Sequence, residues 1–240
     1  MRIDFHTHIL PNVDDGAQNV DTSLRMLREM EKSQVDLVIA TPHYFSLDEK
    51  PVAFKQRISE AARILQDAAA QNGQTMPRIL LGAEVYVERN LLLTEDLDLL
   101  CIGDTDLLLL ELPVSEFREW MYTVLSGVTA IYNVRPVIAH VERVLSRISK
   151  KDLKKILEIP GICFQFNHTA FNDRKAKAFI KKVMKEGYPV FFGSDCHGVS
   201  DRGPTDVSGY AQIRQWLTKK MGKDFPERLS WVQCCELKIE

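Results

Sequence analysis

The chain has 240 residues, of which 45% are hydrophobic and 27% are charged, and its 31 Lys and Arg nearly balance its 33 Asp and Glu. This apolar content excludes a disordered chain, and a net charge of −2 without a basic block argues against nucleic-acid binding. No apolar run approaches the ~18 residues of a membrane-spanning helix, and the first residues lack the apolar region of a secretion signal. We therefore expect a cytoplasmic protein without membrane insertion.

The length suits one domain, which we expect to span residues 1–240, because α/β barrels of about 200–250 residues commonly form a single unit. No repeat, low-complexity stretch or linker divides the sequence. The five cysteines have no zinc-finger spacing, so we expect reduced thiols, as is usual in a cytoplasm.

Seven short runs rich in Val, Ile, Leu and Phe predict β-strands that are buried on both faces. In chain order they are Arg2–His6, Asp36–Thr41, Arg78–Glu84, Asp106–Leu112, Pro136–His140, Ile162–Asn167 and Pro189–Ser194. Amphipathic stretches between them predict helices, the first capped within Asp21–Ser23. These helices are Asp21–Ser33, Ala53–Ala70, Glu116–Tyr132, Lys151–Glu158, Lys175–Lys185 and Gly209–Met221. The alternation predicts a mostly parallel α/β sheet, either a barrel or an open doubly wound sheet.

Side chains that can bind a metal stand at the C-terminal ends of six of the predicted strands. They are His6, His8, His43, Glu84, Glu111, His140, Asp195 and His197. In parallel α/β folds these strand ends converge on one rim, where active sites form. Residues two apart on a strand point to the same face, so His6 and His8 can hold one metal from one side. The sequence therefore predicts a metal site at this rim.

The same residues lie in a series of motifs that follow one another along about residues 1–205. The motifs are Ile3–Pro11 with Val13–Ala17, Ala40–His43, Gly82–Glu84, Leu110–Leu112, Ile138–Arg143 and Gly193–His197. Together they resemble the polymerase-and-histidinol-phosphatase (PHP) metallophosphoesterases, and are most similar to the bacterial manganese-dependent protein-tyrosine phosphatases of capsule and exopolysaccharide gene clusters. The resemblance implies a distorted seven-stranded (β/α) barrel of the PHP type.

The resemblance also implies three divalent metal ions at the rim. Their ligand sets would be, in order, His6, His8, Glu84 and Asp195; then Glu84, Glu111 and His140; then Asp15, His43 and His197. Asp14 stays an alternative to Asp15, since the turn that Gly16 favours can aim either carboxylate inward. Imidazole and carboxylate ligands without a thiolate suit Mn²⁺, Fe²⁺ or Zn²⁺. The resemblance favours Mn²⁺, and Co²⁺ is also compatible.

Charge and family likeness together indicate a phosphate monoester as substrate. Three divalent cations bring six positive charges, and the four carboxylates bring four negative charges, which leaves a net charge of +2. This net charge matches a phosphate monoester, whose charge is close to −2 near pH 7. Arg143 and Arg202 follow strand ends and, by the resemblance, clamp phosphate oxygens. We expect direct hydrolysis by metal-bound hydroxide, with Asp15 or His43 as the nearest proton donor. The resemblance implies a phosphotyrosine protein as partner, namely a membrane-anchored bacterial tyrosine kinase that regulates polysaccharide export.

Several alternatives remain open from the sequence. The chemistry also suits a small-molecule PHP phosphatase acting on histidinol phosphate or a nucleotide, and a non-catalytic, metal-stabilised interaction module is a third interpretation. Residues Cys196 to Arg202 match the C-x₅-R pattern of cysteine-dependent tyrosine phosphatases. We interpret that match as coincidence, because Cys196 alternates with two expected metal ligands and points away from them. His168 we interpret as capping a strand end. After Pro226 no family feature is recognised, which leaves the closing helix and the oligomeric state open.

Overall fold

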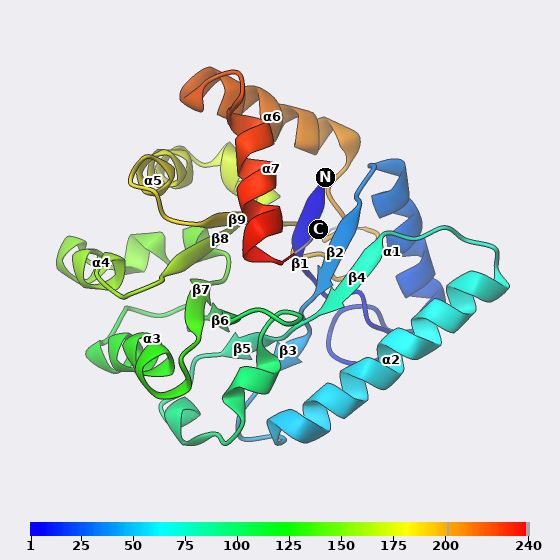
Figure 1. The fold of residues 1–240 in the computed structure, drawn as a ribbon, viewed down its shortest axis with the longest axis horizontal. Coiled ribbons are helices and arrows are strands. Elements are labelled where there is room, and N and C mark those ends of the chain that lie inside the picture. The colour runs from blue at the N-terminus through cyan, green and yellow to red at the C-terminus, as the bar shows by residue number, and fades with distance from the viewer. Residues whose placement is uncertain (201, 239–240) are drawn as a thin grey trace.

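The computed structural model describes residues 1–200 and 202–238, and in them short parallel strands are surrounded by helices (Figure 1). Among the described residues the strands form two hydrogen-bonded sheets. The first sheet joins, in order, β1 (Ile3–Thr7), β2 (Leu37–Ala40) and β4 (Arg78–Leu81). The second joins β3 (His43–Tyr44), β5 (Glu84–Tyr86), β6 (Leu107–Glu111), β7 (Arg135–Ile138), β8 (Cys163–Asn167) and β9 (Val190–Gly193).

The two sheets curl around a common interior. Only Thr41 and Pro42 separate β2 from β3, and only Gly82 and Ala83 separate β4 from β5. Past the end of β9, the Asp195 amide donates to the His6 carbonyl at 2.8 Å, which ties this end of the second sheet to β1. The fold is therefore an α/β fold with a curled parallel sheet.

One of the seven predicted strands is split in the structure, and another is followed by a short strand that was not predicted. The run Arg78–Glu84 was expected to form one strand with Glu84 at its end, and His43 was expected to follow the run Asp36–Thr41, which contains β2. Instead Glu84 opens a new strand, β5, as His43 opens β3. Pro42 has no N–H to continue a ladder, and a Cβ at Gly82 would lie 2.9 Å from the Ile102 side chain, so the backbone approaches that neighbour closely.

Seven α-helices among the described residues cover the outside of the sheet (Figure 1). They are α1 (Val20–Lys32), α2 (Pro51–Gln71), α3 (Glu119–Tyr132), α4 (Lys150–Leu157), α5 (Arg174–Lys185), α6 (Val207–Met221) and α7 (Phe225–Glu236). Single turns of 3-10 helix are also present, at Leu91–Leu93, Leu97–Leu100, Val141–Arg143, Leu145–Arg147 and His168–Asn172. The first six α-helices confirm the predicted ones with shifted ends. The cap of α1 was wrong: Asn19 caps it, since its side chain accepts from the Thr22 amide at 2.9 Å.

Helix α7 closes the end of the curled sheet opposite the predicted rim. Gln233 donates to the carbonyl of Val190 at the start of β9, and Glu236 pairs with Arg135 at the start of β7. Leu237, just past the helix, is buried in the same apolar cluster as Phe5 and Phe191, whose rings stack at 4.0 Å. The end of the chain, left open from its sequence, thus forms a closing helix, while residues 239 and 240 lie outside the described residues.

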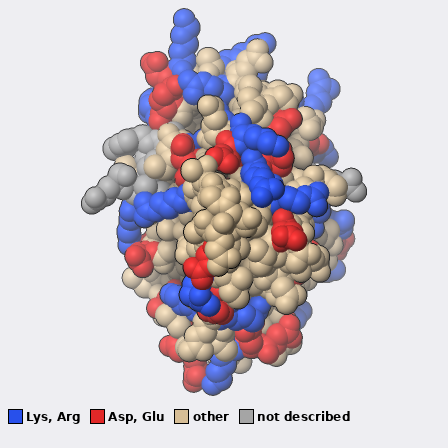
Figure 2. Space-filling view, turned by 90° about the vertical axis from the view of Figure 1, so that its right-hand side faces the viewer, with Lys and Arg blue, Asp and Glu red and all other residues tan. Residues whose placement is uncertain are grey.

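The face over α1 and α2 carries acidic and basic side chains interspersed, as Figure 2 shows. Ion pairs within single helices account for part of this mixture, such as those of Arg63 with Glu60 and Asp67 in α2. This face therefore offers no extended field of one sign to a charged polymer. Across the described residues, no helix combines the length and apolarity needed to cross a membrane.

Candidate metal centre

The structure brings all eight predicted ligand side chains from the strand ends to one rim. They are His6 in β1, His8 just past it, His43 and Glu84 at the first positions of β3 and β5, Glu111 at the end of β6, His140 after β7, and Asp195 and His197 after β9. Residues from the first to the last strand thus meet, although up to 191 positions separate them in the sequence. Their nitrogen and oxygen atoms form three overlapping groups.

The first group comprises His6, His8, Glu84 and Asp195, and all four side chains are buried. The His6 and His8 Nε2 atoms lie 3.1 Å apart, and Glu84 Oε2 lies 3.1 and 3.2 Å from them. Asp195 Oδ1 completes the group at 3.7 and 3.5 Å from the same two nitrogens. Two imidazoles and two carboxylates therefore face one point, in the combination predicted for the first metal.

The second group centres on Glu84 and Glu111 and differs from the prediction in one member. His140 was predicted here, and its Nε2 atom lies 2.8 Å from Glu84 Oε1 and 3.4 Å from Glu111 Oε1. His43 joins the same carboxylates from the other side, with Nδ1 3.2 Å from Glu84 Oε2 and 3.9 Å from Glu111 Oε2. Glu84 is thus shared between the first two groups, as the predicted bridging role requires.

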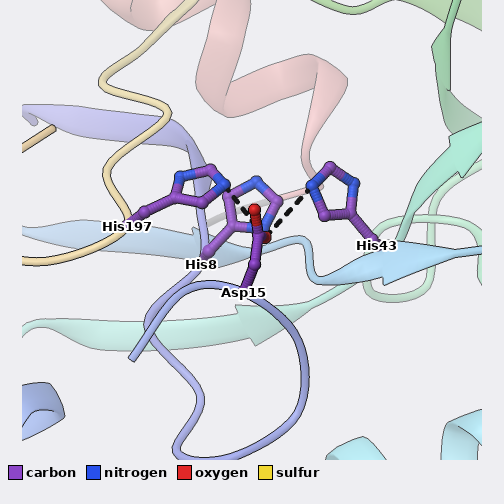
Figure 3. A group of neighbouring side chains, drawn as sticks. All are labelled: His8, Asp15, His43 and His197. Atoms are coloured by element: carbon purple, nitrogen blue, oxygen red, sulfur yellow. Dashed lines mark ion pairs between the residues drawn. The ribbon is translucent and has the colours of Figure 1, made fainter. Parts of the chain in front are cut away.

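The third group gathers His8, Asp15, His43 and His197 around one carboxylate (Figure 3). Asp15 Oδ1 lies 3.4 Å from His43 Nε2 and 3.3 Å from His197 Nε2. Asp15, His43 and His197 are the three residues predicted for this position, and His8 is an addition. Since His8 also belongs to the first group, the three groups form one continuous centre.

Four side-chain atoms in this centre are buried without a hydrogen-bond partner: His43 Nδ1, Glu84 Oε2, His140 Nδ1 and His197 Nε2. Buried polar atoms in proteins nearly always have a partner, because leaving one unpaired costs free energy. All four are of the types that bind divalent cations, and thiolate ligands are missing from the three groups. The residues present therefore fit a divalent metal cluster.

Asp14 supports His8 from behind. Asp14 Oδ2 lies 2.7 Å from His8 Nδ1, and its two oxygens accept the backbone amides of Gly16 and His43 at 2.9 and 3.0 Å. Burial opposes ionisation, but the His8 contact and the two amides lower the pKa of Asp14 to about 2. A Cβ at Gly16 would lie 2.3 Å from the His8 carbonyl oxygen, so the turn needs glycine. The structure thus places Asp15 in the third group and Asp14 behind His8.

Strand β8, for which no metal-binding residue was predicted, supplies amide side chains to the centre. Gln165 Oε1 lies 3.2 Å from His6 Nδ1 and accepts the His140 amide at 2.5 Å. Asn167 donates to Asp195 Oδ2 at 3.0 Å, and Gln165 donates to Asn167 at 3.1 Å. These contacts fix the His6 ring with Nε2 toward the first group. Sequence reasoning missed both residues, and the one signal was polar side chains within an aromatic strand.

Opposite charges dominate the electrostatics of the first two groups, whereas in the third group burial and the charge of His8 lower the pKa of His197 to about 4. Burial alone would lower the pKa of both His8 and His140, but the facing carboxylates raise the pKa of His8 well above its ordinary value and that of His140 to about 9. Burial likewise opposes ionisation of Glu84 and Asp195, yet the neighbouring histidines hold both pKa values below the ordinary range. The centre is therefore a site built for positive charge.

Both predicted phosphate-binding arginines reach this centre. Arg143 Nη2 bonds Asp195 Oδ2, and Arg202 Nη2 lies 3.1 Å from Asp195 Oδ1. Each guanidinium remains partly exposed, so each can also meet a ligand from solvent. His140 and Asp195 adopt positive φ angles of 24° and 55°, a strained backbone that often accompanies functional residues.

Two other sequence hypotheses concern residues near the rim. Cys196 is fully buried, and burial raises the pKa of its thiol well above its ordinary value. Such a thiol is a poor nucleophile, which supports the interpretation of the C-x₅-R match as coincidence; residue 201 within that match lies outside the described residues. His168 lies away from the rim, bonded to Thr205 with its ring 4.8 Å from that of Tyr210.

Comparison with known proteins places this geometry in a family context. The family model for capsular polysaccharide synthesis, CpsB/CapC, matches residues 2–237. The tyrosine-protein phosphatase CpsB of Streptococcus agalactiae serotype III is 29% identical over 224 residues, covering 88% of this chain and 89% of that protein. The tyrosine-protein phosphatase YwqE of Bacillus subtilis is 28% identical over 240 residues, covering 95% and 88%.

Solved structures share the fold. A crystal structure described among those of YwqE from Bacillus subtilis and CpsB from Streptococcus pneumoniae, "unique metal-dependent tyrosine phosphatases", superposes with a TM-score of 0.75 at 23% identity, covering 99% of this chain and 95% of that one. A TatD-family hydrolase from Entamoeba histolytica superposes with a TM-score of 0.55 at 10% identity, covering 98% and 97%.

Proposed function

This chain belongs to the CpsB/CapC family of capsular polysaccharide synthesis, and from that membership we propose that it is a metal-dependent protein-tyrosine phosphatase. The observation that carries the proposal is the convergence of three overlapping imidazole and carboxylate groups on one rim with two arginines beside them. The curated relatives named tyrosine-protein phosphatases support the substrate class.

The proposed ligands follow from the three groups of side chains. The first cation would be held by His6, His8, Glu84 and Asp195, the second by Glu84, Glu111 and His140, and the third by Asp15, His43 and His197. Mn²⁺ is the proposed metal, and the same donor types suit Fe²⁺, Co²⁺ and Zn²⁺. Bound divalent cations would supply Lewis acidity, which lowers the pKa of water and neutralises charge on a phosphoryl group.

The chain's own residues would bind and orient the phosphate. Arg143 and Arg202 present guanidinium groups whose paired N–H donors match two phosphoryl oxygens and stabilise charge as the phosphorus–oxygen bond breaks. A tyrosine phenolate has a pKa near 10, so it leaves with little need of a proton. Where one is needed, Asp15 or His43 is the proposed donor, since both lie on the open side of the third group.

The proposal extends to partner, compartment and architecture. We propose a membrane-anchored bacterial tyrosine kinase as the phosphotyrosine partner, and action in the cytoplasm, which is compatible with the free thiols of Cys101, Cys163, Cys196 and Cys235. Residues 1–240 would act as one catalytic domain. Joining β2 with β3 and β4 with β5 would give the seven strands of a distorted PHP-type barrel.

Hydrolysis of p-nitrophenyl phosphate and of a phosphotyrosyl peptide tests the proposal. Chelator-treated protein should be inactive and should regain activity with Mn²⁺. His6→Ala should lose both metal and rate, whereas Arg143→Ala should keep metal and lose rate. No phosphomonoester hydrolysis by the manganese-loaded protein would contradict the proposal. Hydrolysis of small phosphates without the peptide would instead favour a small-molecule phosphatase.

A further inference from the structure

An aromatic pair, Phe45 and Tyr86, borders the metal centre and takes no part in the three groups of ligands. Phe45 follows β3 two residues after His43, so the two side chains share a face, while Tyr44 between them is buried in the core. The Phe45 ring lies 6.0 Å from the His43 ring and 5.6 Å from the Tyr86 ring, tilted at 37° and 45°. Phe45 stays 38% exposed, so its ring can meet a ligand from solvent.

The segment that carries Phe45 is held in place by Glu88. The Glu88 carboxylate accepts both the amide and the hydroxyl of Ser46, at 3.1 and 2.6 Å. Glu88 lies two residues past β5, the strand that ends with Tyr86, so this contact fixes Phe45 beside Tyr86. In β5, Tyr86 pairs in register with Glu111 of the second ligand group. The exposed Phe45 ring therefore lies beside His43 and Tyr86, at the edge of the centre.

The aromatic pair and the arginines bound the centre on different sides. Phe45 and Tyr86 stand at the ends of β3 and β5, whereas Arg143 and Arg202 follow β7 and β9, and β6 lies between these strands in the sheet (Figure 1). A phosphoryl group held by the arginines and the centre would direct its ester oxygen toward the aromatic side. In an aryl phosphate one oxygen links phosphorus to the ring, so the ring would come to rest next to Phe45.

We propose that Phe45 and Tyr86 form the subsite that receives the aromatic ring of an aryl phosphate, and that they set the preference for phosphotyrosine over alkyl phosphates. The inference rests on the proposed phosphatase function and adds the residues that select the leaving group. Aromatic rings attract one another in tilted and stacked geometries beyond the effect of buried area. An alkyl phosphate has no ring to place there and gains nothing from the pair.

Competitive inhibition of the manganese-loaded enzyme by two non-hydrolysable phosphonates tests the subsite. Phenylphosphonate should inhibit p-nitrophenyl phosphate hydrolysis more tightly than methylphosphonate, and Phe45→Ala should reduce this ratio about tenfold, the order of a lost aromatic contact with its buried area. In Phe45→Ala, the inhibition constant of methylphosphonate should stay within about twofold of its wild-type value. Phe45→Trp should restore the ratio. The matched control is Leu47→Ala, which removes a 72% exposed apolar side chain from the same segment and should leave both constants unchanged.

Two results would overturn the subsite. If Phe45→Ala weakened inhibition by both phosphonates equally, the ring would support the fold of the centre. If the ratio of the two inhibition constants were unchanged, the ring would not meet the substrate. Failure of the wild-type enzyme to hydrolyse any phosphomonoester would refute the proposed function itself, and phenylphosphonate binding, measured directly by calorimetry on the same manganese-loaded protein, would still report on the subsite.

Discussion

Two buried histidines in different regions of this molecule, His140 and His168, have pKa values shifted in opposite directions. At the rim, the carboxylates that face His140 raise its pKa to about 9 although burial opposes this. Beside α6, His168 is also buried, but among the described residues no carboxylate offsets the burial, which lowers its pKa to about 3. Burial is thus common to both regions, and the neighbouring carboxylates decide whether a buried histidine stands in a site that attracts positive charge or packs as a neutral ring. The contrast separates the proposed metal centre from an ordinary part of the core.

Among the substitutions considered, loss of the shared Glu84 carboxylate should lower metal content and activity the most. Glu84→Gln keeps the side-chain shape but removes the charge that the first two groups share. Metal content should fall, and kcat/KM should drop more than about a hundredfold, beyond the effect of losing a supporting residue. Elemental analysis and p-nitrophenyl phosphate kinetics measure both. Glu119→Gln on the exposed side of α3 serves as control, and full metal content in Glu84→Gln would contradict a shared ligand.

Loss of support behind a ligand should have a smaller effect than loss of the ligand itself. Asp14→Asn removes the charge that holds His8 Nδ1, so Mn²⁺ affinity should fall about 10–100-fold. Excess Mn²⁺ should restore most of the rate, since the ligands remain. Manganese titration of activity measures this, with exposed Asp48→Asn as control. An unchanged titration midpoint would show that Asp14 does not position His8.

The His168 region should respond to acid through stability. Its pKa of about 3 in the folded chain lies below the ordinary 6.5, so the unfolded chain binds the proton more readily and stability falls as pH drops from 6.5 toward 3. At pH 5 this costs about 2 kcal/mol relative to pH 7. His168→Gln should remove that part of the pH dependence, measured by denaturant unfolding in chelator at both pH values. Parallel pH profiles for the two proteins would contradict the buried neutral ring.

The smallest expected effect is that of Cys196→Ser. The thiol is buried with a raised pKa, so kcat/KM should stay within about twofold of the wild-type value. Chelator should still abolish the activity of this variant. Loss of activity in Cys196→Ser together with resistance of the wild type to chelator would instead support a cysteine-dependent mechanism.

The fold and the proposed ligands follow from local sequence signals, whereas their supports do not. Apolar runs predicted the strands, and parallel strand ends must converge, so His6 and Asp195 were expected together. The roles of Gln165 and Asp14 depend on strand register and turn geometry. Gln165 contacts His6 across 159 positions of the sequence, and an isolated amide side chain gives no indication of such a partner. The same limit left Asp14 and Asp15 undistinguished until the turn at Gly16 was seen.

Backbone detail at element ends was also beyond the sequence patterns. Asn19 caps α1 in place of Asp21–Ser23, because several capping residues stand in a row and tertiary packing chooses among them. The break at Gly82 splits the predicted run Arg78–Glu84, and the short strand β3 after Pro42 was not predicted. Helix α7 lacks a strong apolar stripe and is stabilised by contacts such as the Arg135 to Glu236 pair, which only the folded chain provides.

Anomalous scattering from crystals grown with Mn²⁺ gives the most direct test of the central claim. The account predicts strong peaks, one within bonding distance of His6, His8, Glu84 and Asp195 and others beside Glu111 and Asp15. Crystals that diffract well yet show no manganese peak among these side chains, or that show manganese only elsewhere on the molecule, would contradict it.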